Sequence, residues 1–159
     1  MSRLQTGGYA PLFDRLGTVN DEKKIYSSRL NIQQLQVSVF SELNRISQTR
    51  SHLDIKEFLN KEPLTVLDYG LPDFFGYSIQ NSSERESVKK VLIKAFLSFE
   101  PRLQNPVIDF DLNQMEKYIL NFHVSGKIIF ETTLDSVTFL ISYAGNETSL
   151  KKKEKLVVW

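Results

Sequence analysis

The chain has 159 residues, of which 41% are apolar and 25% charged, as is typical of a single soluble globular domain. It contains no cysteine, which excludes thiol catalysis, disulfides and cysteine-based metal sites. Twenty basic residues against 19 acidic ones give a net charge of +1, which argues against nucleic-acid binding. No apolar run has the length of a signal peptide or a membrane span, so we expect a cytoplasmic protein without membrane insertion.

Residues 1–22 are predicted to form a flexible docking arm ahead of a single domain over residues 23–159. Gly7 and Gly8 precede Pro11, and such residues favour a mobile lead-in. The arm also carries apolar side chains spaced to dock as one turn of helix, namely Leu12, Phe13 and Leu16.

Two long helices are expected. The first runs from about Ser27 to Arg50, with Ser27 and Ser28 as N-caps and an apolar stripe formed by Ile32, Leu35, Val39, Leu43 and Ile46. The second begins at the capping box Ser83-Glu84-Arg85-Glu86, stops before Pro101, and presents Val88, Val91, Leu92, Ala95, Phe96 and Phe99. Residues 51–82 between them are predicted to be irregular, with one or two short helices and a fixed turn at Tyr69-Gly70-Leu71-Pro72.

After Pro106 the apolar period becomes two, which predicts strands. We expect one strand over residues 107–112, one from Tyr118 to Thr132, a turn from Thr133 to Ser136, and a third strand whose inward face is Val137, Phe139, Ile141 and Tyr143. Gly126 suggests a bulge or bend inside the second strand, and Lys155 to Trp159 are a candidate last strand. The pattern predicts an α+β fold with two long helices on one face of a three- to four-stranded, mainly antiparallel sheet.

The residues offer little for catalysis. His52 and His123 have no partner at metal-ligand spacing, and the alternating Asp109 and Asp111 are what a solvent-facing strand ordinarily carries. We therefore expect no enzyme activity, no metal and no cofactor. The segment Glu100-Pro101-Arg102 is different, because a carboxylate and a guanidinium at a helix end can anchor a loop or a partner through charged hydrogen bonds.

Three motifs suggest a family. Pro11-Leu12-Phe13-Asp14-Arg15-Leu16, Asp68-Tyr69-Gly70-Leu71-Pro72-Asp73 and Phe99-Glu100-Pro101-Arg102-Leu103 occur in the order found in TssE. From about Pro11 to Tyr143 the chain resembles this family of type VI secretion baseplate subunits, which is similar to the short wedge protein of contractile phage-tail baseplates.

The resemblance implies a scaffold that links wedge subunits and primes assembly of the contractile sheath, at the inner face of the bacterial inner membrane. The implied partners are the wedge subunits TssF, TssG and TssK and the sheath subunits TssB and TssC, with the spike protein VgrG nearby. An edge of the strands from Tyr118 to Tyr143 would accept sheath strands. The partner-binding residues carried over are Leu12, Phe13, Arg15, Leu16, Tyr69, Leu71, Pro72, Glu100, Pro101 and Arg102.

Two other functions are open at this point. An anti-adaptor of the same fold family binds a response-regulator adaptor and blocks proteolysis of a sigma factor, and it shares a motif of the Glu-Pro-Arg type. A peptidoglycan-cleaving enzyme, which the older name "lysozyme-like" would suggest, is less favoured because the sequence has no credible acid pair.

Overall fold

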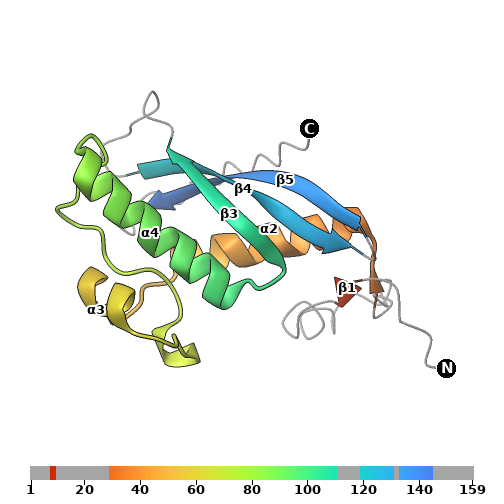
Figure 1. Cartoon of the computed structure of the whole chain (residues 1–159), viewed down its shortest axis with the longest axis horizontal. Helices are drawn as coiled ribbons and strands as arrows, with labels where there is room; N and C mark the ends of the chain where they lie inside the picture. The colour runs from red at the N-terminus through yellow and green to blue at the C-terminus, as the bar shows by residue number, and fades with distance from the viewer. Residues whose placement is uncertain (1–7, 10–28, 111–118, 131–132, 145–159) are drawn as a thin grey trace.

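The computed structural model describes residues 8–9, 29–110, 119–130 and 133–144 (Figure 1). Its elements in chain order are β1 (Gly8–Tyr9), β2 (Arg29–Leu30), α2 (Ile32–Gln48), α3 (Ile55–Asn60), the 3-10 turn η1 (Val66–Asp68), α4 (Ser82–Phe99), β3 (Leu103–Phe110), β4 (Ile119–Phe130) and β5 (Thr133–Ala144).

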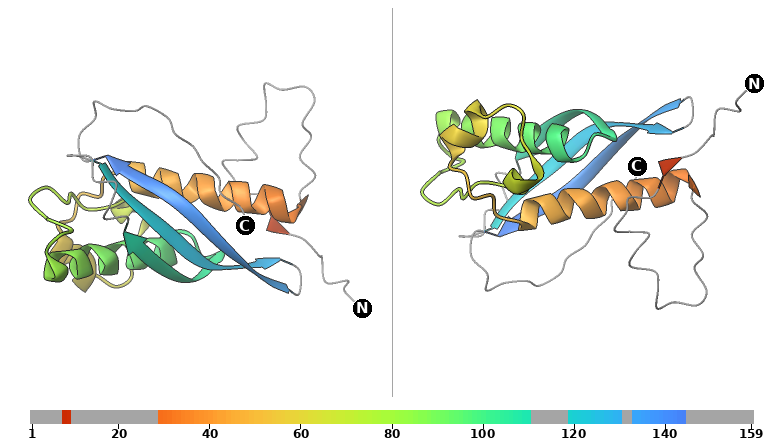
Figure 2. Two further views of the ribbon diagram at one scale, coloured as in Figure 1. Left: turned by 90° about the horizontal axis from the view of Figure 1, so that it is seen from above. Right: turned by 90° about the horizontal axis from the view of Figure 1, so that it is seen from below.

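The molecule has two layers. Strands β3, β4 and β5 form an antiparallel sheet in that order, and a separate small sheet pairs β1 with β2. Both long helices cover the same face of the larger sheet, α4 beneath β3 and α2 beneath β5 (Figure 2). This confirms the predicted α+β arrangement. None of the helices in the described ranges is long and apolar enough to cross a membrane.

Helix α2 begins later than predicted. The side chain of Asn31 accepts a hydrogen bond from the Gln34 amide at 2.8 Å, and the Gln34 side chain accepts one from the Asn31 amide at 3.0 Å. This capping box fixes the start at Ile32, so the prediction of Ser27 and Ser28 as caps is wrong. The predicted stripe is confirmed for the side chains that are buried against the sheet, which are Leu35, Val39, Leu43 and Ile46.

Helix α4 begins two residues earlier than the predicted capping box would place it. Asn81 is the N-cap and accepts from the Ser83 amide at 3.0 Å, while Glu84 accepts from the Ser78 amide at 2.6 Å. The box predicted from Ser83 to Glu86 is therefore wrong, because Asn81 satisfies the first free amides instead. The predicted end is confirmed, since the helix stops at Phe99.

The sheet confirms the inward face predicted for the third strand, because Val137, Phe139, Ile141 and Tyr143 of β5 are buried. On the neighbouring strand β4, Phe122, Val124 and Ile128 are buried as well. The predicted turn from Thr133 to Ser136 is wrong, because β5 already begins at Thr133, which pairs with Phe130. Strand β3 likewise starts at Leu103, before Pro106.

The irregularity expected at Gly126 lies in the neighbouring strand. Gln104 pairs with Lys127 and Val107 with Ser125, so β3 carries a bulge opposite Gly126 while β4 and β5 pair without a shift. Asn105 in the bulge has a φ of 50°. A Cβ atom on Gly126 would come within 2.6 Å of the Leu103 side chain. Glycine is needed here because the bulged part of β3 lies so close to the backbone of Gly126.

Several expectations fall outside the described residues. These are the docking-arm residues Leu12, Phe13, Arg15 and Leu16, the acid Asp111, and the candidate last strand from Lys155 to Trp159. Of residues 1–22, the structure describes Gly8 and Tyr9, which pair with Leu30 and Arg29 ahead of α2. Within residues 51–82, α3 and η1 are the short helices that were expected.

Candidate functional site

The segment Glu100-Pro101-Arg102 forms an ion pair where α4 passes into β3. Arg102 donates from Nε to Glu100 Oε1 at 2.7 Å and from Nη2 to Oε2 at 2.5 Å, and its amide donates to Oε1 at 3.1 Å. Glu100 is only 1% exposed, whereas the Arg102 side chain is 23% exposed. Bidentate charged hydrogen bonds of this kind hold both planar groups in one geometry.

The same guanidinium reaches the first long helix. Arg102 Nη1 donates to the hydroxyl of Ser38 in α2 at 2.9 Å. Pro101 lies exposed between the two charged residues and prevents α4 from continuing. The motif therefore ties the end of α4, the start of β3 and the middle of α2 together. It leaves Pro101 and part of Arg102 facing solvent, while Glu100 is enclosed.

Tyr69 brings the second motif to the same helix. Its hydroxyl donates to Glu42 Oε1 of α2 at 2.6 Å, and its ring packs on Phe99 at 5.2 Å between centroids. Burial and the neighbouring Glu42 carboxylate raise the pKa of Tyr69 well above its usual range, since both disfavour the phenolate. Glu42 also forms an ion pair with Arg45. Tyr69 remains partly exposed.

The remaining turn residues are internal. Leu71 is completely buried, its amide donates to the Thr49 carbonyl at 2.9 Å, and its own carbonyl accepts from the Ser51 amide at 2.9 Å. Pro72 is buried, and its carbonyl accepts a hydrogen bond from the Tyr143 hydroxyl of β5 at 3.5 Å. These two residues hold the loop against the end of α2 and against β5.

Two motifs that are 30 residues apart in the chain thus meet on one side of α2. Ser38 accepts the hydrogen bond from Arg102, and Glu42, four residues further on the same helix face, accepts the one from Tyr69. Arg45, three residues beyond Glu42, forms an ion pair with Glu42. Sequence reasoning did not single out Ser38, Glu42 or Arg45, because nothing local to α2 indicates which distant residues they meet. The spacing of polar residues at 38, 42 and 45 is the signal that was available.

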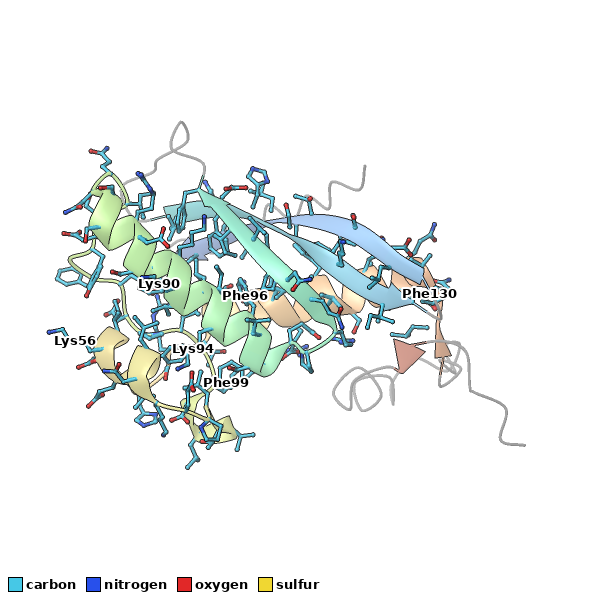
Figure 3. The ribbon with its side chains drawn as sticks, in the orientation of Figure 1. Lys56, Lys90, Lys94, Phe96, Phe99 and Phe130 are labelled. Carbon is cyan, nitrogen blue, oxygen red and sulfur yellow. The ribbon has the colours of Figure 1, made fainter. Side chains whose placement is uncertain are left out.

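A second polar cluster stabilises the loop between α3 and α4. Asp68 is fully buried and accepts from Lys61 Nζ at 2.6 Å, from the Thr65 amide at 2.7 Å and from the Thr65 hydroxyl at 2.8 Å. The hydrogen bond from Lys61, followed by that from the Thr65 amide, lowers the pKa of Asp68 to about 2. Nearby, Lys94 points from α4 towards α3 (Figure 3) and donates to the carbonyls of Leu59 and Lys61, both at 2.8 Å.

This cluster predicts a specific acid sensitivity. Because Asp68 has a lower pKa in the folded protein than the value of about 3.9 in an unfolded chain, its stabilisation is complete above about pH 4. It is lost as the pH falls from about 4 to 2. Asp68→Asn should therefore be less stable than the wild type at pH 6, with a difference that shrinks at pH 3, in urea unfolding curves.

Asp109→Asn, which changes an exposed acid on the sheet, is the matched control and should leave this pH dependence intact. If the wild type and Asp68→Asn lost stability in parallel between pH 6 and 3, the assignment to Asp68 would be wrong.

The two histidines considered for chemistry lie in separate parts of the fold. His52 contacts the Leu67 carbonyl through Nδ1 at 3.2 Å, while His123 lies exposed on β4, paired with Asp109 of β3 and Leu140 of β5. Across the described ranges, no three side chains among His, Cys, Asp and Glu gather closely enough to hold a metal ion.

Comparison with known proteins identifies the family. Residues 33–133 match the family model described as "Baseplate wedge protein gp25". The chain therefore belongs to the gp25 baseplate wedge family, which confirms the resemblance seen in its motifs. The match spans α2, both motifs that meet on it, and the sheet as far as the start of β5.

One solved structure is similar, a chain from "The baseplate complex from the type VI secretion system". It is 20% identical, with a TM-score of 0.47, and the match covers 70% of the present chain and 95% of that one. No curated protein matches the chain.

Proposed function

We propose that this chain is a structural baseplate component of a type VI secretion machine, where it links wedge subunits and primes assembly of the contractile sheath. The observation that carries the proposal is the meeting of the Tyr-Gly-Leu-Pro and Glu-Pro-Arg motifs on one side of α2. Membership of the baseplate wedge family and the order of the motifs in the chain support it. In this role the protein is a scaffold and not an enzyme.

The wedge contact would use the exposed parts of the motif surface. The hydrogen bonds that Arg102 donates to the Glu100 carboxylate and to the Ser38 hydroxyl hold its guanidinium at a fixed position. The remaining surface of the guanidinium lies next to exposed Pro101. A guanidinium held in this way loses little side-chain entropy when it binds a carboxylate or a carbonyl of a partner. Glu100 and the buried Leu71 and Pro72 would act by positioning this surface, and Tyr69 would contribute its exposed edge.

The other proposed contacts follow from the resemblance. The wedge subunits TssF, TssG and TssK would bind the motif surface and the arm residues Leu12, Phe13, Arg15 and Leu16, with the spike protein VgrG nearby. The sheath subunits TssB and TssC would add strands to an edge of the sheet. Assembly would take place in the cytoplasm, at the inner face of the inner membrane.

The test is affinity purification of the tagged chain from its native bacterium, followed by mass spectrometry. Pro101→Glu places a negative charge on the exposed part of the motif surface and should deplete the wedge subunits at least about fivefold, since like-charge repulsion at an interface opposes binding. Lys56→Glu, on exposed α3 away from the motif (Figure 3), is the control and should retain them. Melting temperatures of both variants should stay close to that of the wild type.

Equal recovery of wedge subunits with both variants would contradict the proposed contact. Recovery of a response-regulator adaptor without wedge or sheath subunits would instead support the anti-adaptor function. Clearing of purified peptidoglycan by the chain, abolished by Glu100→Gln, would contradict a purely structural role.

A further inference from the structure

Two aliphatic side chains project into solvent from the 3-10 turn η1. Val66 is 87% exposed and Leu67 is 80% exposed, and the two are neighbours in the chain. Figure 1 shows the yellow-green segment that contains them below α4, on the side of the molecule away from the sheet. Single exposed apolar residues are common on protein surfaces, but an adjacent pair this exposed contributes little to its own fold. We call Val66 and Leu67 the apolar tip.

The buried Asp68 carboxylate holds the turn beneath the apolar tip. It accepts hydrogen bonds from the amide and the hydroxyl of Thr65, which precedes the tip, and from Lys61 Nζ. The Asp68 amide in turn donates to the Thr65 carbonyl at 3.0 Å. A buried carboxylate needs such partners, because its transfer out of water is costly. The network therefore fixes the conformation of this turn.

Contacts from neighbouring residues hold the apolar tip as well. His52 Nδ1 contacts the Leu67 carbonyl at 3.2 Å, and the Tyr69 amide donates to the Val66 carbonyl at 3.4 Å. Apolar side chains on a backbone that is already ordered lose little conformational entropy when they enter a pocket. The tip is therefore preorganised for binding.

The charges around the apolar tip indicate what kind of partner it fits. Lys61 forms an ion pair with Asp68, and Glu62 forms one with Lys94 of α4 at 3.7 Å. Residues 51–68 contain two lysines, no arginine and four acids, which gives a net charge of −2 (2 − 4) with histidine neutral. Nucleic acid and anionic lipid both require an excess of positive charge. A protein pocket lined by aliphatic side chains fits the tip instead.

The apolar tip is continuous with the surface that the two motifs form. Tyr69 lies two residues after Leu67, donates to Glu42 of α2 at 2.6 Å, and packs on Phe99, which adjoins Glu100. Consecutive Cα atoms are about 3.8 Å apart, so Tyr69 and Leu67 lie within about 8 Å of each other. A partner that covers the exposed edge of Tyr69 would therefore also reach the tip.

We propose that the apolar tip is an anchor that inserts into an aliphatic pocket of a wedge subunit, beside the contact made by the Glu-Pro-Arg motif. Asp68 acts as a positioning residue, because its hydrogen bonds hold the tip in the conformation that the pocket accepts. The inference rests on the proposed wedge-linking function. It adds two binding residues, Val66 and Leu67, and the chemistry of the pocket that receives them.

Binding of the full chain to the purified wedge subunits tests the anchor. The double variant Val66→Ser with Leu67→Ser removes the apolar surface of the tip, so its affinity should be at least about tenfold weaker. Its melting temperature should stay close to that of the wild type, because neither side chain is buried.

A matched double variant controls for the loss of exposed apolar surface. Val107→Ser with Leu134→Ser changes the same two residue types, which are 50% and 56% exposed on the face of the sheet opposite the helices. This variant should bind the wedge subunits as the wild type does. Equal losses in the two double variants would overturn the inference.

A double-mutant cycle tests whether Asp68 acts through the apolar tip. Asp68→Asn should weaken wedge binding severalfold, measured well below the melting temperature of each variant. Adding Asp68→Asn to the tip variant should weaken binding by less than about a further twofold, because the tip has already lost the side chains that Asp68 positions. Losses that multiply in full would show that Asp68 affects binding by another route and would overturn its positioning role.

The anchor and the wedge-linking function can fail separately. If the tip variant binds as the wild type does while Pro101→Glu weakens binding, the anchor is wrong and the contact of the Glu-Pro-Arg motif stands. If the wild-type chain does not bind the wedge subunits, both the anchor and the wedge-linking function are wrong.

Discussion

Replacing Arg102 by alanine should reduce the free energy of unfolding by about 3–5 kcal/mol, because it leaves the buried Glu100 carboxylate without a counter-ion. The substitution also removes the bond to Ser38 that joins this corner to α2. Urea unfolding at pH 7 measures the change. Since most domains of this size are stable by about 5–15 kcal/mol, the variant should still fold at 25 °C but with a much reduced midpoint.

Two controls separate the charge from the packing. Ser38→Ala removes the hydrogen bond from Arg102 and should cost about 1 kcal/mol. The double variant Glu100→Met with Arg102→Met replaces both charges by apolar chains and should recover most of the loss. If Arg102→Ala were as stable as the wild type, the ion pair would not hold the α4–β3 junction.

Replacing Gly70 by alanine should cost at least about 2 kcal/mol, because both the backbone and the space around it require glycine. Its φ of 105° is one that other residues rarely adopt. A Cβ atom there would also lie 2.5 Å from the Thr49 carbonyl oxygen, in the backbone that pairs with Leu71. The thermal midpoint and the urea midpoint should both fall.

Gly76 provides a control for the backbone alone. Its φ is 87°, yet an added Cβ would meet nothing within 4 Å. Gly76→Ala should therefore cost about 1 kcal/mol from backbone strain, and the excess loss in Gly70→Ala measures the collision with Thr49. Equal losses at the two positions would show that the close approach of Thr49 is easily relieved.

The features that could be predicted from the sequence were those in which apolar residues repeat at short, regular intervals. The stripe of Leu35, Val39 and Leu43 and the alternation through Val137, Phe139 and Ile141 depend on helix and strand geometry, which repeats over a few residues. Helix starts were harder to predict, since Ser27, Asn31, Asn81 and Ser83 are all suitable caps and the surrounding structure selects among them.

The site required knowledge of contacts across the chain. The motif residues could be named from the sequence. It could not be predicted that Glu100 and Leu71 would be buried, or that Ser38 and Glu42 would accept hydrogen bonds from the two motifs. Gly126 shows the same limitation, because the reason for a glycine there is a bulge about 20 residues away in β3.

The packing of α2 beneath β5 also sets the order of folding during synthesis. Phe40 and Phe139 are about 100 residues apart, so the main apolar partner of α2 is the last strand of the sheet to leave the ribosome. At about 5–20 residues per second, α2 would wait roughly 5–20 s with its apolar stripe uncovered. Such distant contacts also slow the search for the native topology. The nascent chain is therefore open to chaperone binding until β5 emerges.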